Sequence, residues 1–174
     1  MNNWRGKLLS IVLVLFSLIF DGFIASYWST SLDTSYGLMV PRITFLLFII
    51  LSFHYEKKFM LFSAVIFGLL MDTYYLGFTG IYLFSLILIV LIVSKVRRLI
   101  SPNVLTYTML AIIILTLIEI FIYMVIRILG MTGMTMQEFL VNKLAATLLL
   151  NTVIMVFTSY FIQKLILSVN ENKS

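Results

Sequence analysis

The sequence predicts an all-α polytopic membrane protein with six transmembrane helices and both termini in the cytoplasm. The first observation is composition: the 174 residues are 62% hydrophobic and 11% charged, whereas soluble domains are about half apolar and a quarter charged. The second is that the apolar residues fall into six long runs separated by short polar connections. The third is the distribution of Lys and Arg among those connections, which is typical of an oriented membrane protein.

Crossing the hydrocarbon core takes about 20 mostly apolar residues in a helix. Ser101-Pro102 has the pattern of an N-cap followed by proline, which predicts the start of a helix. Thr135 and Glu138 fit a capping box, so the last helix is expected to begin before the membrane. The chain therefore forms one domain, residues 1–174, with predicted spans at about 8–28, 38–55 (opened by Pro41), 59–76, 80–95, 104–128 and 139–166.

The basic residues set the orientation. With a cytoplasmic N-terminus, nine of the 12 Lys and Arg residues lie on the inside, and every inner connection carries some of them. The three on the outside are Arg42, Arg127 and Lys143. The positive-inside rule therefore predicts cytoplasmic termini. It also explains the net charge of +5, so we expect no nucleic-acid partner.

Six charged residues are predicted to lie within spans or at span ends, near the midplane or in the outer half of the membrane. An unpaired ion at that depth is strongly disfavoured, so we expect them to pair. For Asp72 we expect Arg42 or Arg127 as the partner, with backbone donors of the Gly77/Gly80 turn beside it. The network can fix the register of the bundle, dock a partner or bind a ligand, and the sequence leaves these roles and the other pairings open. Its members are Asp21, Arg42, Asp72, Glu119, Arg127 and Lys143.

Small residues recur every fourth position on two of the predicted helices. Ser17, Asp21 and Ala25 share one face of the first, and Ala64, Gly68 and Asp72 share one face of the third. Small residues let helices approach closely in membranes. We therefore expect the first and third helices to pack together through these faces.

The sequence carries no recognisable catalytic or metal-binding pattern. It has no cysteine and one histidine, and it contains no His-Glu-x-x-His helix, Gly-x-Ser-x-Gly elbow or phosphate-binding loop. Asp21 and Asp72 do not suggest an intramembrane aspartyl protease, because Met71 stands where those enzymes carry glycine before the aspartate. We expect no catalytic residues, no metal, no cofactor and no enzymatic activity.

The run "FGLLMDTYYLGFTGIYLFSLIL" resembles the signature region of the rod shape-determining protein MreD family. The resemblance is carried by a Gly-Leu-Leu-x-Asp pattern, a short turn with two glycines and a further apolar helix. The length, helix count and Pro41 near the second span are similar too. The residues that carry the motif here are Gly68, Leu69, Leu70, Asp72, Gly77 and Gly80.

The resemblance implies a non-catalytic, multi-pass subunit of the bacterial cytoplasmic membrane, in the complex that elongates the cell wall and supports cell shape and peptidoglycan synthesis. It implies MreC as a partner, with a glycan polymerase and a transpeptidase reached directly or through MreC, and membrane lipid around the bundle. It also implies a fold similar to the S subunits of energy-coupling-factor transporters. The alternative is therefore a substrate-binding S subunit of a vitamin transporter.

Three methionines in the predicted outer loop "GMTGMTMQE" are candidates for a partner surface. Met131, Met134 and Met136 precede the first charge of the loop, Glu138. Methionine side chains are flexible and adapt to partner surfaces. Either this loop docks a partner, or it dips into the membrane interface and binds nothing.

Overall fold

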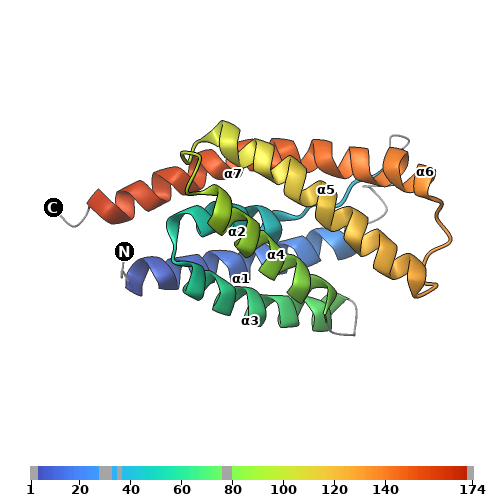
Figure 1. Cartoon of the computed structure of the whole chain (residues 1–174), viewed down its shortest axis with the longest axis horizontal. Helices are drawn as coiled ribbons and strands as arrows, with labels where there is room; N and C mark the ends of the chain where they lie inside the picture. Colours follow the sequence, from blue (N-terminus) through green and yellow to red (C-terminus); the bar gives the residue numbers. More distant parts are fainter. Residues whose placement is uncertain (1–3, 28–32, 35–36, 76–79, 172–174) are drawn as a thin grey trace.

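The computed structural model describes residues 4–27, 33–34, 37–75 and 80–171. Two short strands, β1 (Asp33–Thr34) and β2 (Gly37–Leu38), form an antiparallel pair between α1 and α2. A short helix, α6 (Met136–Glu138), continues through a π-helix, η1 (Phe139–Leu144), into the last helix. The six main helices are α1 (Trp4–Tyr27), α2 (Ile43–His54), α3 (Lys57–Tyr75), α4 (Ile81–Val96), α5 (Val104–Ile128) and α7 (Ala145–Glu171) (Figure 1).

The prediction of an all-α polytopic membrane protein is confirmed. Within the described residues, four stretches are long and apolar enough to cross a membrane: Gly6–Ile24, Lys57–Tyr75, Val104–Ile128 and Met136–Ile162. The other two main helices, α2 and α4, have 12 and 16 residues. At 1.5 Å per residue they extend about 18 and 24 Å, which is less than the roughly 30 Å of hydrocarbon in a bilayer.

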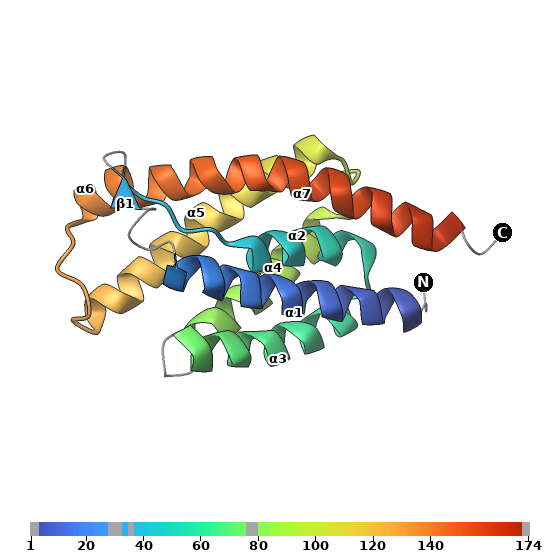
Figure 2. The ribbon, with the colours of Figure 1, turned by 180° about the vertical axis from the view of Figure 1, so that it is seen from behind.

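The shortest of the main helices, α2, lies at the centre of the bundle (Figure 2). Nine consecutive residues, Thr44 to Ser52, are buried, and a helix that is apolar all round belongs in a core. It packs against α1, α4, α5 and α7. A core helix need not span the membrane, because its ends are enclosed by the protein and not by lipid.

The predicted second span, 38–55, is wrong at its N-terminal end, because α2 begins only at Ile43. Proline at position 41 disfavours helical conformation at the residue before it. Arg42 has a non-helical backbone with φ −131° and ψ 48°, and residues 39–42 form no helix or strand. The chain therefore approaches α2 as irregular backbone.

Two predicted helix starts have different outcomes. The capping box is confirmed, because Thr135 accepts from the Glu138 amide and Glu138 accepts in return from the Thr135 amide. The start of α5 is two residues later than predicted from Ser101-Pro102. Its N-cap is Asn103, whose Oδ1 accepts from the amide of Thr106 at 2.7 Å, so the proline lies before the helix.

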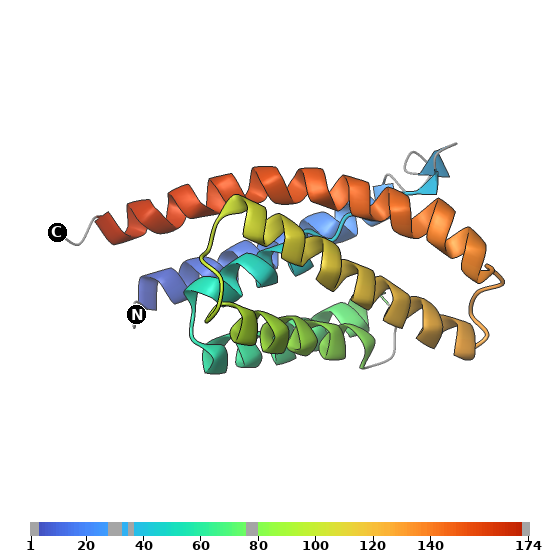
Figure 3. The same cartoon turned by 45° about the horizontal axis from the view of Figure 1, so that its top comes forward.

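The start of α1 and the end of α7 lie at the same end of the bundle (Figure 1). The α2–α3 and α4–α5 connections lie at this end too, and the α5–α6 connection lies at the other (Figure 3). Lys57, Lys58 and Arg98 are exposed at the first end. The arrangement fits the topology predicted from the sequence, in which this end faces the cytoplasm. That orientation stays a prediction.

Candidate functional site

A carboxylate from α1 caps the buried start of α2. The two oxygens of Asp21 accept from the backbone amides of Ile43 at 3.0 Å and Thr44 at 2.9 Å. These amides have no partner within α2, because the first four N–H groups of any helix lack one. A negative charge is also favoured at the positive end of the helix dipole. Asp21 is 6% exposed, so its position in an apolar span is explained by this capping role.

A carboxylate from α3 caps the start of α4 in the same way. Asp72 accepts from the amides of Gly80 and Tyr82, both at 2.8 Å, and from Leu83 at 3.2 Å. The side chain is fully buried. The expected ion pair of Asp72 with Arg42 or Arg127 is therefore corrected, although the expected backbone donor at Gly80 is present.

The two caps show that the repeated spacing of small residues and aspartate on α1 and α3 corresponds to a structural repeat. In each half of α1–α4, a long helix carries an aspartate near its end, and that aspartate binds the first amides of the next, shorter helix. Small residues one turn earlier bring each pair together. Ser17 Oγ lies 3.2 Å from Thr44 Oγ1, and a Cβ placed on Gly68 would lie 2.5 Å from Leu83 Cα.

The expected packing of α1 against α3 through their small faces is therefore wrong. Ser17 faces α2 and Gly68 faces α4, while Ala64 is buried. The side chain of Ala25 lies outside the described residues. Small residues permit close approach of two helices but do not determine which helix approaches. Here each small face contacts the helix that the aspartate of the same face caps.

The motif residues form one unit of the α3–α4 hairpin. Gly68 allows close contact with the α4 backbone at Leu83, and Asp72 accepts hydrogen bonds from the first amides of α4. Gly80 has φ +127°, a backbone conformation that residues other than glycine rarely adopt. Leu69 and Leu70 are 41% and 47% exposed on the outside of the bundle, where lipid is expected. Gly77 lies outside the described residues.

A buried ion pair joins the segment before α2 to α5. Arg42 Nε lies 2.7 Å from Glu119 Oε1, and its Nη1 donates to the hydroxyl of Tyr82 at 3.1 Å. Arg42 and Glu119 are 9% and 1% exposed. Removing one partner of such a pair costs about 3–5 kcal/mol, because the other charge is left buried alone.

Side chains of α7 satisfy the irregular backbone around Arg42. Asn151 Oδ1 accepts from the Arg42 amide at 2.8 Å, and its Nδ2 donates to the carbonyl of Val40 at 2.8 Å. The hydroxyl of Thr147 accepts from the Val40 amide at 3.2 Å. Non-helical backbone at membrane depth is tolerated only where protein or water satisfies it.

A polar cavity of about 170 Å³ lies beside this ion pair. Lys143, half-buried in the π-helix η1, lines this cavity together with Arg42. Glu119 Oε2 has no hydrogen-bond partner among the described residues. The cavity is lined by Asp21, Val40, Pro41, Arg42, Met71, Tyr75, Tyr82 and Lys143. Since π-helices are frequent at functional sites, we take this cavity and the buried charges around it as the candidate functional site.

Two predicted site groups lie outside the cavity. Arg127 is exposed and donates to the Tyr123 hydroxyl at 2.6 Å. In the methionine loop, Met131 and Met136 are 58% and 36% exposed. Met134 packs instead against the cluster formed by Tyr123, Phe139 and Leu144. Only the first and last of the three methionines therefore present a large surface.

The sequence reading missed three residues of the site. Tyr82, Thr147 and Asn151 are all buried, and they hold Arg42 and the backbone before it. Asn151 carries a usable signal, since an amide in the middle of an apolar span marks a helix contact. The described residues contain no group of three His, Cys, Asp or Glu side chains that could hold a metal.

Comparison with known proteins identifies a family. The family described as rod shape-determining protein MreD matches residues 5–169. A relative from Bacillus subtilis (strain 168), the rod shape-determining protein MreD, is 25% identical over 113 residues, or 65% of this chain. The matched region is 66% of that relative, slightly under two thirds of its length. No solved structure matches, so the likeness to transporter S subunits and the vitamin-transporter alternative find no support.

Proposed function

The chain belongs to the rod shape-determining protein MreD family, and we propose that it is a non-catalytic, multi-pass subunit of the bacterial cytoplasmic membrane that binds MreC. In this role it stabilises the complex that elongates the cell wall, and it reaches the glycan polymerase and the transpeptidase directly or through MreC. The observation that carries the proposal is the family match across residues 5–169. Membership of this family supports a rod shape-determining membrane protein.

The contacts of the buried charged side chains support a binding role. Asp21 and Asp72 are occupied as helix caps, and Arg42 and Glu119 bind each other. These contacts hold α1–α5 in one arrangement and give each of the four charged side chains a structural partner. A rigid bundle of this kind suits the positioning of partner proteins.

The exposed methionines provide the partner surface in this proposal. Met131 and Met136 flank the loop at the end of α5, and Tyr123 fixes that loop by donating its hydroxyl proton to the Met134 carbonyl at 2.9 Å. Because the loop backbone is already held in place, binding orders little further backbone, and the flexible methionine side chains can adapt to the partner. We place the extramembrane contact with MreC there.

Co-purification in mild detergent tests the proposal. Tagged protein should retain MreC and wall synthases, and the double substitution Met131→Ala/Met136→Ala should lower MreC recovery severalfold. The matched control is Met109→Ala/Met124→Ala, two methionines of α5 that are 58% and 50% exposed outside the loop. No MreC with the unaltered chain would reject the proposed function, and equal loss in both doubles would reject only the surface.

A further inference from the structure

The face between α1 and α3 carries an apolar groove that no residue of the described chain fills. It encloses about 300 Å³, the volume of about ten water molecules at roughly 30 Å³ each. Methylene groups are of similar size, so part of one acyl chain fits. The lining is Ile11, Leu15, Phe59, Phe62, Ser63, Ile66, Phe67 and Leu70.

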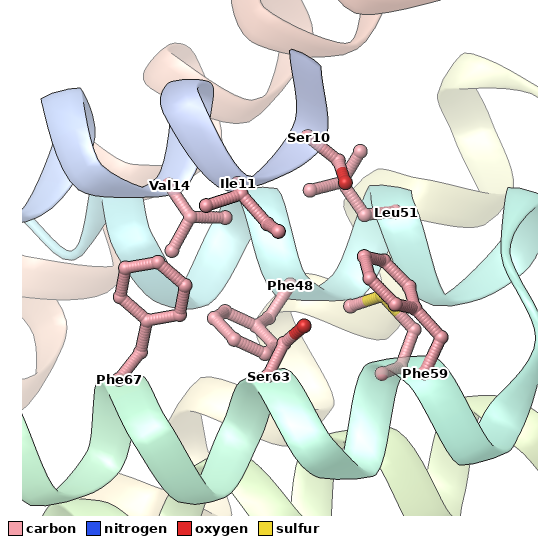
Figure 4. Close-up of a pocket in the computed structure, with 9 residues that line it drawn as sticks. Ser10, Ile11, Val14, Phe48, Leu51, Phe59, Ser63 and Phe67 are labelled. Carbon is pink, nitrogen blue, oxygen red and sulfur yellow. The ribbon is translucent and has the colours of Figure 1, made fainter. Parts of the chain in front are cut away.

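Residues of the core lie next to the groove. Figure 4 shows Phe59, Ser63 and Phe67 rising from α3 toward Ile11 and Val14 of α1, with Phe48 and Leu51 of α2 behind them. Phe48 and Leu51 are buried and line a smaller adjoining cavity of about 10 Å³, which shares Ile11, Phe59, Ser63 and Phe67 with the groove. Its sides stay open, since Phe62 and Leu70 are 67% and 47% exposed.

One end of the groove is positively charged. Lys7 precedes Ile11 and Leu15 at four-residue spacing on α1, and Lys58 precedes Phe62 and Ile66 in the same way on α3. Each lysine therefore lies one turn beyond the groove, on the face that lines it.

The contacts place this charge at the mouth of the groove. Lys7 Nζ lies 5.5 Å from the centroid of the Phe59 ring, which is part of the lining. Lys57 and Glu56 are exposed beside Lys58. This end of the groove therefore has three lysines, Lys7, Lys57 and Lys58, and one carboxylate, that of Glu56. Both α1 and α3 begin at this end, and the positive ends of their dipoles add to the field.

We propose that this groove is a binding site for an anionic phospholipid, with one acyl chain between α1 and α3 and the phosphate at Lys7 and Lys58. The positive charge of Lys7 and Lys58 complements the negative charge of the phosphate, which favours an anionic phospholipid as the ligand. A transmembrane helix of a partner needs no anionic group beside Lys7 and Lys58, whereas a phospholipid joins an acyl chain and a phosphate in one molecule. The site goes beyond the proposed MreC contact, which lies on the loop after α5.

Lipid retention on the purified full-length chain, measured by native mass spectrometry, tests the site. The probes are phosphatidylglycerol and phosphatidylcholine with identical acyl chains. A lysine near an anionic surface contributes about a fivefold preference. Because independent contributions multiply, the unaltered chain with Lys7 and Lys58 should retain phosphatidylglycerol about 25-fold better. Lys7→Gln/Lys58→Gln should remove most of this preference. The matched control Lys95→Gln/Arg98→Gln deletes two exposed charges from the α4–α5 end and should change retention less than twofold.

The acyl-chain half of the site needs its own variant. Ile66→Trp enlarges a lining residue that is 42% exposed and should lower retention of both lipids several-fold. Its control is Ile113→Trp on α5, at a residue that is 56% exposed and lies outside the groove. If the lysine double does not fold, Lys58→Gln alone serves, since that exposed side chain should still account for about fivefold.

Several outcomes would overturn the site. Equal retention of both lipids by the unaltered chain would do so, as would an equal loss in the Lys95/Arg98 control. Normal retention in Ile66→Trp would mean that no chain enters the groove, and competition by inorganic phosphate alone would reduce the site to a surface anion contact. A dimer of the unaltered chain that Ile66→Trp dissociates would assign the groove to a second copy.

Discussion

Replacing Asp72 with alanine removes all three acceptor contacts at the start of α4. The amides of Gly80, Tyr82 and Leu83 donate to this carboxylate at 2.8, 2.8 and 3.2 Å. A buried donor left without a partner costs about 1–3 kcal/mol. Three of them sum to roughly 3–9 kcal/mol, and fraying of the first turn of α4 relieves part of this. We expect Asp72→Ala to lower the free energy of unfolding by about 3–5 kcal/mol.

The substitution Asp72→Asn distinguishes the capping role of this side chain from an effect of its buried charge alone. Asparagine keeps one acceptor oxygen, and its best orientation puts that oxygen where Oδ2 accepts from Gly80 and Leu83. Only the contact with the Tyr82 amide is then lost. Asp72→Asn should therefore cost about 1–3 kcal/mol, clearly less than alanine.

The assay is equilibrium unfolding in mixed micelles, followed by near-ultraviolet circular dichroism. The control is Glu56→Gln, which changes an exposed carboxylate at the other end of α3 and should stay within about 0.5 kcal/mol. A double-mutant cycle with Arg127→Gln should be additive, because Arg127 donates to Tyr123. If Asp72→Ala changed the free energy of unfolding by less than about 1 kcal/mol, the capping argument would be refuted. A large coupling energy between Asp72 and Arg127 would instead support an ion pair between them.

Three further predictions concern the rest of the bundle. Gly68→Ala places a Cβ 2.5 Å from Leu83 Cα and should cost about 1–3 kcal/mol in the same unfolding assay; unchanged stability would mean that α3 and α4 are farther apart. Arg42→Gln should cost about 3–5 kcal/mol by stranding Glu119, and adding Glu119→Gln should recover part of the loss, whereas further loss on addition would contradict the pair. For topology, the native chain has no cysteine, so Gln137→Cys should react in intact cells with a membrane-impermeant thiol reagent and Ser101→Cys should not; the reverse pattern would invert the orientation.

The sequence by itself determined the class of protein and the family. Apolar run length is a local property set by membrane thickness, so the predicted ranges for the first, third, fourth and fifth spans fall close to α1, α3, α4 and α5. The capping box at Thr135 was also readable, because both of its hydrogen bonds join residues three apart. The Gly-Leu-Leu-x-Asp run was sufficient to suggest the family, which the match over residues 5–169 then established.

Only the tertiary structure decided what the buried charges bind. Asp21 and Asp72 bind backbone amides, and every residue has such an amide, so no sequence pattern marks the partner. Arg42 lies 77 positions from Glu119 and 109 from Asn151 along the chain, and only packing of α2 among α5 and α7 brings them together. The late start of α2 has the same origin: α1 and α7 supply hydrogen bonds to the backbone at residues 40–44, so this segment is stable without forming a helix from residue 38.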